Sequence, residues 1–188
     1  MSELFDIVDE QGLPTGETID RETAHSQGIL HRTAHLWLMR KRENGVEILV
    51  QKRSANKDSF PSCYDISSAG HIPAGVDFKL SAIRELKEEL GLDACEEELI
   101  YCGTRRIRGE KEFHGKMFRD NQVSNVYCIW RDVEPEECTL QVEEVEEVRW
   151  ISLRECMERV ALEDPAFCIK MEELLMLPKE LERCPVSI

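Results

Sequence analysis

The sequence predicts a layered α/β or α+β fold in which strands and helices are mixed and neighbouring strands are mostly antiparallel. Three observations lead to this prediction. Short apolar stretches typical of strands recur along the chain, helices begin at recognisable capping residues, and turn residues separate these elements. The length of 188 residues suits one domain, and a hydrophobic content of 41% is enough for a sizeable core.

The N-terminal region, residues 1–29, is predicted to form an extension with a strand, a turn and a short helix. Residues 3–8 (ELFDIV) are typical of a strand, and the EQGLPTGE that follows is typical of a turn because it contains proline and glycine. Asp20 is a favourable N-cap for a short helix, and Gly28 is a favourable residue to end it.

Five further stretches have the composition of strands. Residues 31–39 and 46–53 flank an Asn-Gly pair, which is typical of a hairpin turn. Residues 98–108 and 122–130 are expected to pair, joined by a polar loop with several basic residues, and residues 147–152 form a last short strand.

Three further helices are predicted after the first hairpin. Residues 79–90 form a helix that a glycine ends. Ser152 is followed three residues later by a glutamate, which is the spacing of a capping box and predicts a helix over 152–161. An Asp-Pro pair opens the last helix, over 164–177.

The chain is strongly acidic. It has 24 Lys and Arg against 38 Asp and Glu, giving a formal net charge of −14. Such a charge argues against a nucleic-acid polymer or an anionic membrane as the main partner. The N-terminus lacks the pattern of a signal peptide, and the eight cysteines form neither C-x-x-C pairs nor zinc-finger spacings. We therefore expect a cytoplasmic protein with reduced cysteines.

The helix over 79–90 concentrates acidic residues on one side. Glu85, Glu88 and Glu89 are spaced i, i+3, i+4, so their carboxylates are neighbours on the helix surface. Such a cluster is either a solvated face or a site for a hard divalent cation, which prefers oxygen ligands. Arg84 is placed to orient one of the carboxylates.

The whole segment 70–92 resembles the Nudix box, G-x5-E-x7-R-E-U-x-E-E-x-G-U, where U is a bulky aliphatic residue. Val76 stands at the position of the first glutamate, with Asp77 next to it, so Asp77 would substitute if the loop shifted by one residue. The matching positions are Gly70, Arg84, Glu85, Leu86, Glu88, Glu89, Gly91 and Leu92.

The resemblance extends to the opening of the chain and to residues 51–71 and 120–127, which are similar to the Nudix branch related to isopentenyl-diphosphate isomerase. It implies one Nudix domain over 1–188, folded as an α/β/α sandwich with a mixed central sheet and additional antiparallel strands. It also favours a homodimer.

For chemistry, the resemblance implies a hydrolase in which Mg²⁺ or Mn²⁺ binds a diphosphate and water attacks one phosphorus. Glu85, Glu88 and Glu89 would be the metal ligands together with the carbonyl of Gly70, and Arg84 would orient the carboxylates. Nudix enzymes often recruit another acid from outside the box. Here Glu143 and Glu144 are the candidates, and we favour Glu144 as the further catalytic acid.

A small diphosphate substrate needs positive partners in an acidic chain. The pre-box loop offers Arg53 and Lys57, the box offers His71, and the basic 103–120 segment offers Arg119, so these four are the predicted substrate-binding residues. Three further histidines, His25, His31 and His35, lie near one another in the N-terminal part of the sequence. A histidine in a strand is more often structural than a ligand.

Two alternatives remain. The first is an isopentenyl-diphosphate isomerase-like enzyme, but those isomerases use a cysteine immediately before the glycine of the box, where this chain has Ala69. The second is a binding module without catalysis, which Val76 favours and the three retained carboxylates disfavour. We predict the hydrolase.

Overall fold

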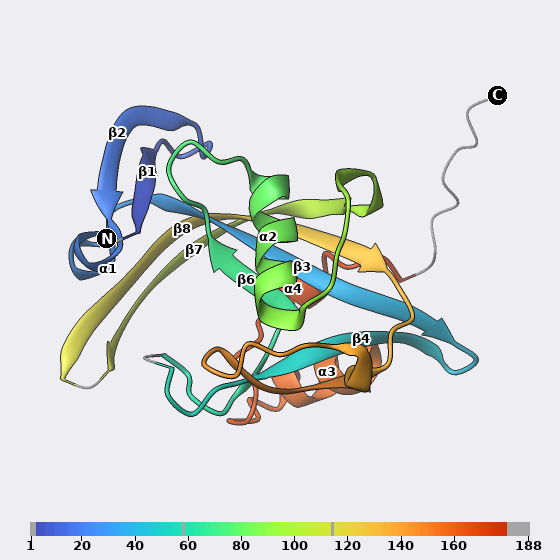
Figure 1. Cartoon of the computed structure of the whole chain (residues 1–188). Coiled ribbons are helices and arrows are strands. Elements are labelled where there is room, and N and C mark those ends of the chain that lie inside the picture. The colour runs from blue at the N-terminus through green and yellow to red at the C-terminus, as the bar shows by residue number, and fades with distance from the viewer. Residues whose placement is uncertain (1–2, 58, 114, 180–188) are drawn as a thin grey trace.

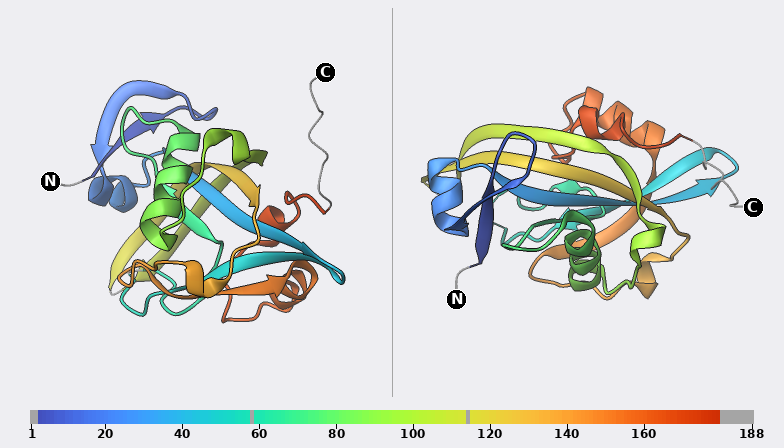
Figure 2. Two further views of the ribbon diagram at one scale, coloured as in Figure 1. Left: turned by 45° about the vertical axis from the view of Figure 1, so that its right-hand side comes forward. Right: turned by 90° about the horizontal axis from the view of Figure 1, so that it is seen from above.

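A computed structural model describes residues 3–57, 59–113 and 115–179. Within these ranges a seven-stranded mixed sheet runs through the molecule, with helix α2 on one face and helices α3 and α4 on the other (Figures 1 and 2). A separate two-stranded sheet, β1–β2, and helix α1 form the N-terminal extension. The elements are β1 (Leu4–Val8), β2 (Pro14–Asp20), α1 (Arg21–Gln27), β3 (His31–Arg42), β4 (Gly45–Arg53), β5 (Tyr64–Asp65), β6 (Ser68–His71), α2 (Phe78–Leu90), η1 (Glu96–Glu98), β7 (Ile100–Phe113), β8 (Lys116–Trp130), η2 (Pro135–Glu137), β9 (Val145–Ser152), α3 (Leu153–Ala161) and α4 (Met171–Leu174).

Strand β3 organises the sheet. It runs parallel to β8 along its length, and its other edge is shared between β6 near its beginning and β4 near its end, both antiparallel. Strand β6 therefore lies beside the first half of β3, where α2 packs against it. This arrangement places the segment that follows β6 directly over the sheet and confirms the predicted layered fold with a mixed central sheet.

The two faces of β3 belong to two hydrophobic clusters, as the period of two in a strand requires. Leu36 and Leu38 pack with Leu86 and Leu90 of α2. Trp37 and Met39 point to the opposite face, where they pack with residues of α3 and of the C-terminal segment, including Cys156, Ile169 and Leu174.

The N-terminal extension is largely as predicted. The carboxylate of Asp20 accepts a hydrogen bond from the backbone N–H of Thr23 at 2.9 Å, and Gly28 ends α1 in the left-handed region at φ 70°. The turn predicted over EQGLPTGE is present but ends at residue 13, because Pro14–Asp20 forms β2 and pairs with β1. A turn signal acts locally, whereas this strand is stabilised by its partner.

Two other predictions are corrected. The basic segment expected to be a loop is the distal part of a long hairpin, in which β7 and β8 remain paired as far as Phe113 and Lys116. The last predicted helix is reduced to the single turn α4. Residues before α4 instead bond to β5, since Tyr64 donates its N–H to the Ala166 carbonyl at 2.7 Å and accepts from Cys168 N–H at 3.0 Å.

None of the described helices is both long and apolar enough to cross a membrane.

Candidate functional site

Helix α2 and the turn before it build the first part of the site. The Asp77 carboxylate accepts a hydrogen bond from Leu80 N–H at 2.9 Å and so caps the helix, which Gly91 ends at φ 72°. Asp77 is therefore committed to the cap, and the structure shows no one-residue shift of the loop of the kind that would let Asp77 replace the missing glutamate.

The turn that contains Val76 is held from outside the box. Arg32 donates to the Val76 carbonyl at 2.9 Å and to Asp6 at 2.7 Å, and the same Asp6 oxygen accepts the Gly75 N–H at 2.9 Å. The Val76 side chain packs against the core cluster beneath α2. An ion pair between the N-terminal extension and β3 thus fixes the loop without a carboxylate at position 76.

Gly70 and Glu85 lie in unusually close contact. A Cβ atom at position 70 would be 2.0 Å from Cδ of Glu85, so only glycine leaves room for this carboxylate. Arg84 donates to the Glu85 carboxylate and, at 3.3 Å, to the His71 carbonyl. The Glu85 carboxylate therefore lies directly against the Gly70 backbone, and these residues fit a cation site.

Glu89 lies deeper, with 6% of its surface exposed. It accepts hydrogen bonds from Ala69 N–H at 3.2 Å and from Gln51 Nε2 at 3.3 Å. Burial raises the pKa of Glu89 to about 7, and the neighbouring charge of Glu85 adds to the effect against the opposing hydrogen bonds. A divalent cation would supply the positive charge that this buried carboxylate lacks. Glu88, the residue directly before Glu89 on α2, is exposed and lies about one turn after Glu85.

The predicted acid outside the box meets a predicted substrate cation. Glu144 lies in the turn before β9 and forms an ion pair with Lys57, while Glu143 is exposed. Burial lowers the pKa of the Lys57 ammonium group, and the charge of Arg53 adds to this. Arg53 pairs with Asp65 at 3.0 Å and donates to the Ser59 carbonyl at 3.1 Å. These residues come from separate segments and gather beside β4.

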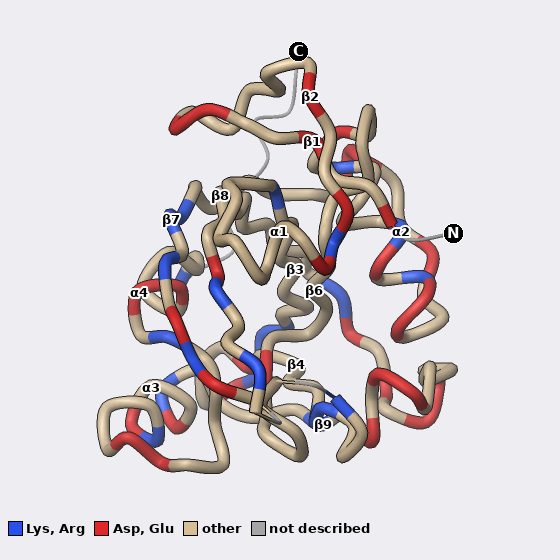
Figure 3. The backbone as a smooth tube through the Cα atoms, turned by 90° about the vertical axis from the view of Figure 1, so that its left-hand side faces the viewer, with Lys and Arg blue, Asp and Glu red and all other residues tan. Residues whose placement is uncertain are grey.

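Arg119 is placed differently. It pairs with Glu110 across the β7–β8 hairpin at 3.2 Å and donates to the Ser26 carbonyl at the end of α1. Acidic residues accompany the basic ones along this hairpin (Figure 3), and Arg106 and Arg108 both reach Glu10 of the extension. The local positive charge of the segment is therefore largely neutralised by neighbours.

His71 belongs to a cluster of three imidazoles with His25 and His31. One ring nitrogen from each lies within 4.8 Å of the others, and the Nε2 atoms of His71 and His25 are 3.1 Å apart. Burial lowers the pKa of all three, that of His31 to about 4, so the rings are neutral and able to ligate. This cluster is a candidate site for a second, softer divalent cation.

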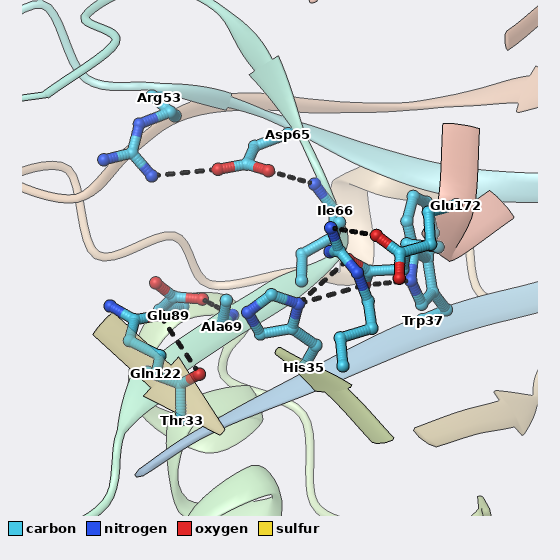
Figure 4. A network of polar contacts seen from close by, with 12 residues as sticks. Thr33, His35, Trp37, Arg53, Asp65, Ile66, Ala69, Glu89, Gln122 and Glu172 are labelled. Carbon is cyan, nitrogen blue, oxygen red and sulfur yellow. Dashed lines mark hydrogen bonds and ion pairs between the residues drawn. The ribbon is translucent and has the colours of Figure 1, made fainter. Parts of the chain in front are cut away.

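A second polar cluster was missed by the sequence analysis. Glu173 of α4 is 2% exposed, and its carboxylate accepts from Trp37 Nε1 at 2.9 Å, from His35 Nδ1 at 3.0 Å and from Arg105 (Figure 4). Burial opposes ionisation of Glu173, but the charge and hydrogen bond of His35, with Arg105 and Trp37, outweigh it and lower the pKa to about 2. The sequence offered one sign of this cluster: Glu173 lies four residues before Leu177, on the apolar side of the helix predicted over 164–177.

Acid unfolding tests this carboxylate. The pKa of Glu173 falls from an ordinary 4.5 to about 2 on folding, so ionised Glu173 stabilises the fold above pH 4.5 and that stability is lost as the pH falls towards 2. Its contribution is about 3 kcal/mol. The groups that face it are His35 and Arg105, and Arg105 also contacts Glu172.

We expect the free energy of unfolding of Glu173→Gln to vary less between pH 5 and pH 2 than that of the unmodified chain, measured by urea unfolding. Glu172→Gln is the matched control, because Glu172 is the exposed neighbour on the same turn. Equal pH dependence of Glu173→Gln and the unmodified chain would contradict the assignment.

Comparison with known proteins places the chain in a protein family. The model of the NUDIX domain matches residues 29–168, which is most of the chain. The chain belongs to the Nudix family. Nudix hydrolase 3 of Arabidopsis thaliana is 38% identical over 174 residues, 88% of this chain and 21% of its own length. An uncharacterized Nudix hydrolase of Clostridium acetobutylicum is 37% identical over 143 residues, 76% of this chain and 66% of its own length. The chain thus spans only a part of these two Nudix relatives.

Solved structures share the Nudix fold. The protein DR0079 of Deinococcus radiodurans superposes with a TM-score of 0.64 at 17% identity, covering 85% of this chain and 90% of that one. The NUDIX domain of Shewanella oneidensis NrtR, solved with ADP ribose, has a TM-score of 0.53 at 14% identity and covers 78% of this chain and 82% of that one. At these identities the likeness concerns the fold alone.

Proposed function

We propose that the protein is a metal-dependent Nudix hydrolase that cleaves the diphosphate linkage of a small nucleoside-diphosphate-type substrate by attack of water at phosphorus. The observation that supports this most strongly is the contact of Gly70 with Glu85, beside the buried carboxylate of Glu89. A solvated acidic face would need neither the glycine nor the burial. Family membership supports the same reaction class.

In this proposal the carboxylates of Glu85, Glu88 and Glu89 and the Gly70 carbonyl hold Mg²⁺, or Mn²⁺ in its place. The bound ion supplies Lewis-acid activation of the phosphoryl group, activation of water and neutralisation of charge. Arg84 keeps Glu85 in position through their ion pair.

The residues beside β4 complete the proposed site. Glu144 accepts the proton of the attacking water, and Lys57, its partner, balances the charge of the carboxylate. Arg53 and Lys57 are the predicted contacts of the substrate phosphates, with Arg53 held in place by Asp65. Burial of Lys57 raises the strength of its interaction with an anion, because little water surrounds it.

The nucleotide part of the proposal draws on the family. The Shewanella NUDIX domain was solved with ADP ribose, and a C. elegans structure with a TM-score of 0.51 at 21% identity is that of an Ap4A hydrolase. Both compounds contain a nucleoside linked through phosphates to a second group. We therefore propose this class of substrate rather than one compound.

An isomerase-like activity is the second candidate, and the cluster of His25, His31 and His71 favours it, because the resemblance to isomerases rests in part on the N-terminal histidines. Ala69 disfavours it, since alanine transfers no proton. Deuterium exchange into isopentenyl diphosphate in D₂O distinguishes this alternative from the hydrolase.

The hydrolase is tested with a panel of nucleoside di- and triphosphates, nucleotide sugars and dinucleotides, read by mass spectrometry. We expect Mg²⁺-dependent release of a monophosphate from at least one compound, loss of that activity in excess EDTA, and recovery when Mg²⁺ is returned. Absence of release from every compound with both Mg²⁺ and Mn²⁺ would favour the binding module.

A further inference from the structure

His35 and Glu173 form a carboxylate–imidazole pair next to the proposed site. The Glu173 oxygens lie 3.0 and 3.1 Å from Nδ1 of His35, so Nδ1 carries the hydrogen and donates to the ionised carboxylate. This bond fixes the ring orientation and leaves Nε2 as the free ring atom. Nδ1 cannot then serve any other partner.

Glu173 has partners besides His35. Arg105, itself buried, forms an ion pair with the carboxylate, and Trp37 supplies a further donor. His35 serves Glu173 through Nδ1 alone, and its second ring nitrogen has no hydrogen-bond partner among the described residues.

The free edge of the imidazole is directed away from Glu173. Figure 4 shows the His35 ring with Trp37 on one side and Ala69, Glu89 and Gln122 on the other. The register of β3 with β6 places His35 opposite Ala69, whose N–H binds Glu89. The His35 side chain is 14% exposed and that of Glu173 only 2%, so the imidazole is the more accessible group of the pair.

His35 is also linked to another residue of the proposed site. Burial raises the pKa of Asp120, and Arg53 and His35 both act against this effect. Arg53 is one of the predicted phosphate contacts. His35 thus lies between its partner Glu173 and the residues Ala69 and Glu89.

We propose that His35 is a substrate-contacting residue, whose Nε2–H in the imidazolium form donates a hydrogen bond to an oxygen of the diphosphate, and that Glu173 is the residue that positions it. The proposal rests on the proposed function for the identity of the ligand. The position before the box glycine, where the isomerases have a cysteine, is Ala69 here, and Ala69 lies directly opposite His35 in the sheet.

Two substitutions of His35 separate a substrate contact from a structural role. In His35→Asn the side-chain amide can still donate to Glu173 from near the position of Nδ1, but no atom remains at Nε2. In His35→Gln a polar atom is kept near Nε2. We expect kcat/KM to fall about tenfold or more in His35→Asn and less in His35→Gln, with the Tm of His35→Asn close to that of the unmodified chain.

A structural role predicts the reverse. If Glu173 needs only a donor from position 35, His35→Asn retains activity and His35→Gln loses stability. That result would overturn the proposal.

A binding measurement tests the contact without catalysis, in case the variants fold poorly or the substrate is not found. The probe is methylenediphosphonate with Mg²⁺, added to the uniformly ¹⁵N-labelled full chain. We expect the Nε2 resonance of His35 to shift on titration, while the Nδ1 resonance keeps the signature of a protonated nitrogen bonded to carboxylate.

The outcomes of the two experiments are distinguishable. A shift at His35 without turnover of any compound supports the diphosphate contact and counts against the hydrolase. Turnover with an unmoved His35 resonance at millimolar probe overturns this inference and leaves the hydrolase standing.

Discussion

Replacement of Glu89 by glutamine is expected to lower kcat/KM for Mg²⁺-dependent diphosphate hydrolysis by about 100- to 1000-fold without unfolding the chain. Glutamine has nearly the same volume, and its carbonyl oxygen can still accept the Ala69 N–H that Glu89 accepts at 3.2 Å. What it removes is one negative charge from the proposed metal site. The measurement is steady-state turnover on the best compound of the panel, with Mg²⁺ varied.

The same substitution should stabilise the metal-free protein. Glu89 is 6% exposed and has no cationic hydrogen-bond partner among its donors, Ala69 and Gln51, so its charge opposes folding. We expect the Tm of Glu89→Gln in EDTA to be equal to or above that of the unmodified chain, and the rise of Tm on adding Mg²⁺ to be reduced.

The matched control is Glu158→Gln, an exposed carboxylate of α3 that pairs loosely with Arg154 at 3.8 Å. Its activity and its response to Mg²⁺ should be unchanged. Full activity of Glu89→Gln would show that this carboxylate does not hold the ion, and the metal assignment on α2 would fail.

The sequence predicted those parts of the fold that depend on neighbouring residues. The caps of Asp20 and Ser152 and the glycine that ends α2 were found because a cap acts within one helical turn. The errors at Pro14–Asp20 and over residues 164–170 arose where another strand supplies the hydrogen bonds, β1 for the first and β5 for the second. In both places the local signal, a turn or an N-cap with proline, competes with pairing that has no sequence signature.

The same distinction applies to the candidate site. The carboxylates of α2 could be predicted, because their spacing along one helix fixes their relative positions. The pair of His35 with Glu173 could not, since the two residues are 138 positions apart and only the return of the C-terminal segment to β3 joins them. Lys57 and Glu144 are 87 positions apart in the sequence. Each was predicted as a site residue, but their ion pair was not.

Gly70→Ala should abolish most of the metal-dependent activity while leaving the fold intact. The added Cβ would lie 2.0 Å from Cδ and 2.4 Å from Cγ of Glu85, so this carboxylate must move. These are atoms at the flexible end of a side chain, and backbone is not among the three nearest atoms. The displaced carboxylate loses its contact with Arg84 and its position against the Gly70 backbone.

We therefore expect kcat/KM to fall about 100-fold and the affinity for Mg²⁺ to weaken, with a loss of about 1–3 kcal/mol in the free energy of unfolding from the broken Arg84 contact. Isothermal titration with Mg²⁺ and urea unfolding measure the two effects separately.

Gly109→Ala is the matched control, because a Cβ at that position meets no atom within 4 Å and its φ lies outside the left-handed region. It should leave activity and metal affinity unchanged. A further variant tests the cause of the loss: Glu85→Ala removes the side-chain atoms that the new Cβ meets. If displacement of Glu85 causes the defect, Gly70→Ala should weaken Mg²⁺ binding no further in a chain that already carries Glu85→Ala. Unchanged Mg²⁺ affinity in Gly70→Ala itself would contradict a role for this contact in the metal site.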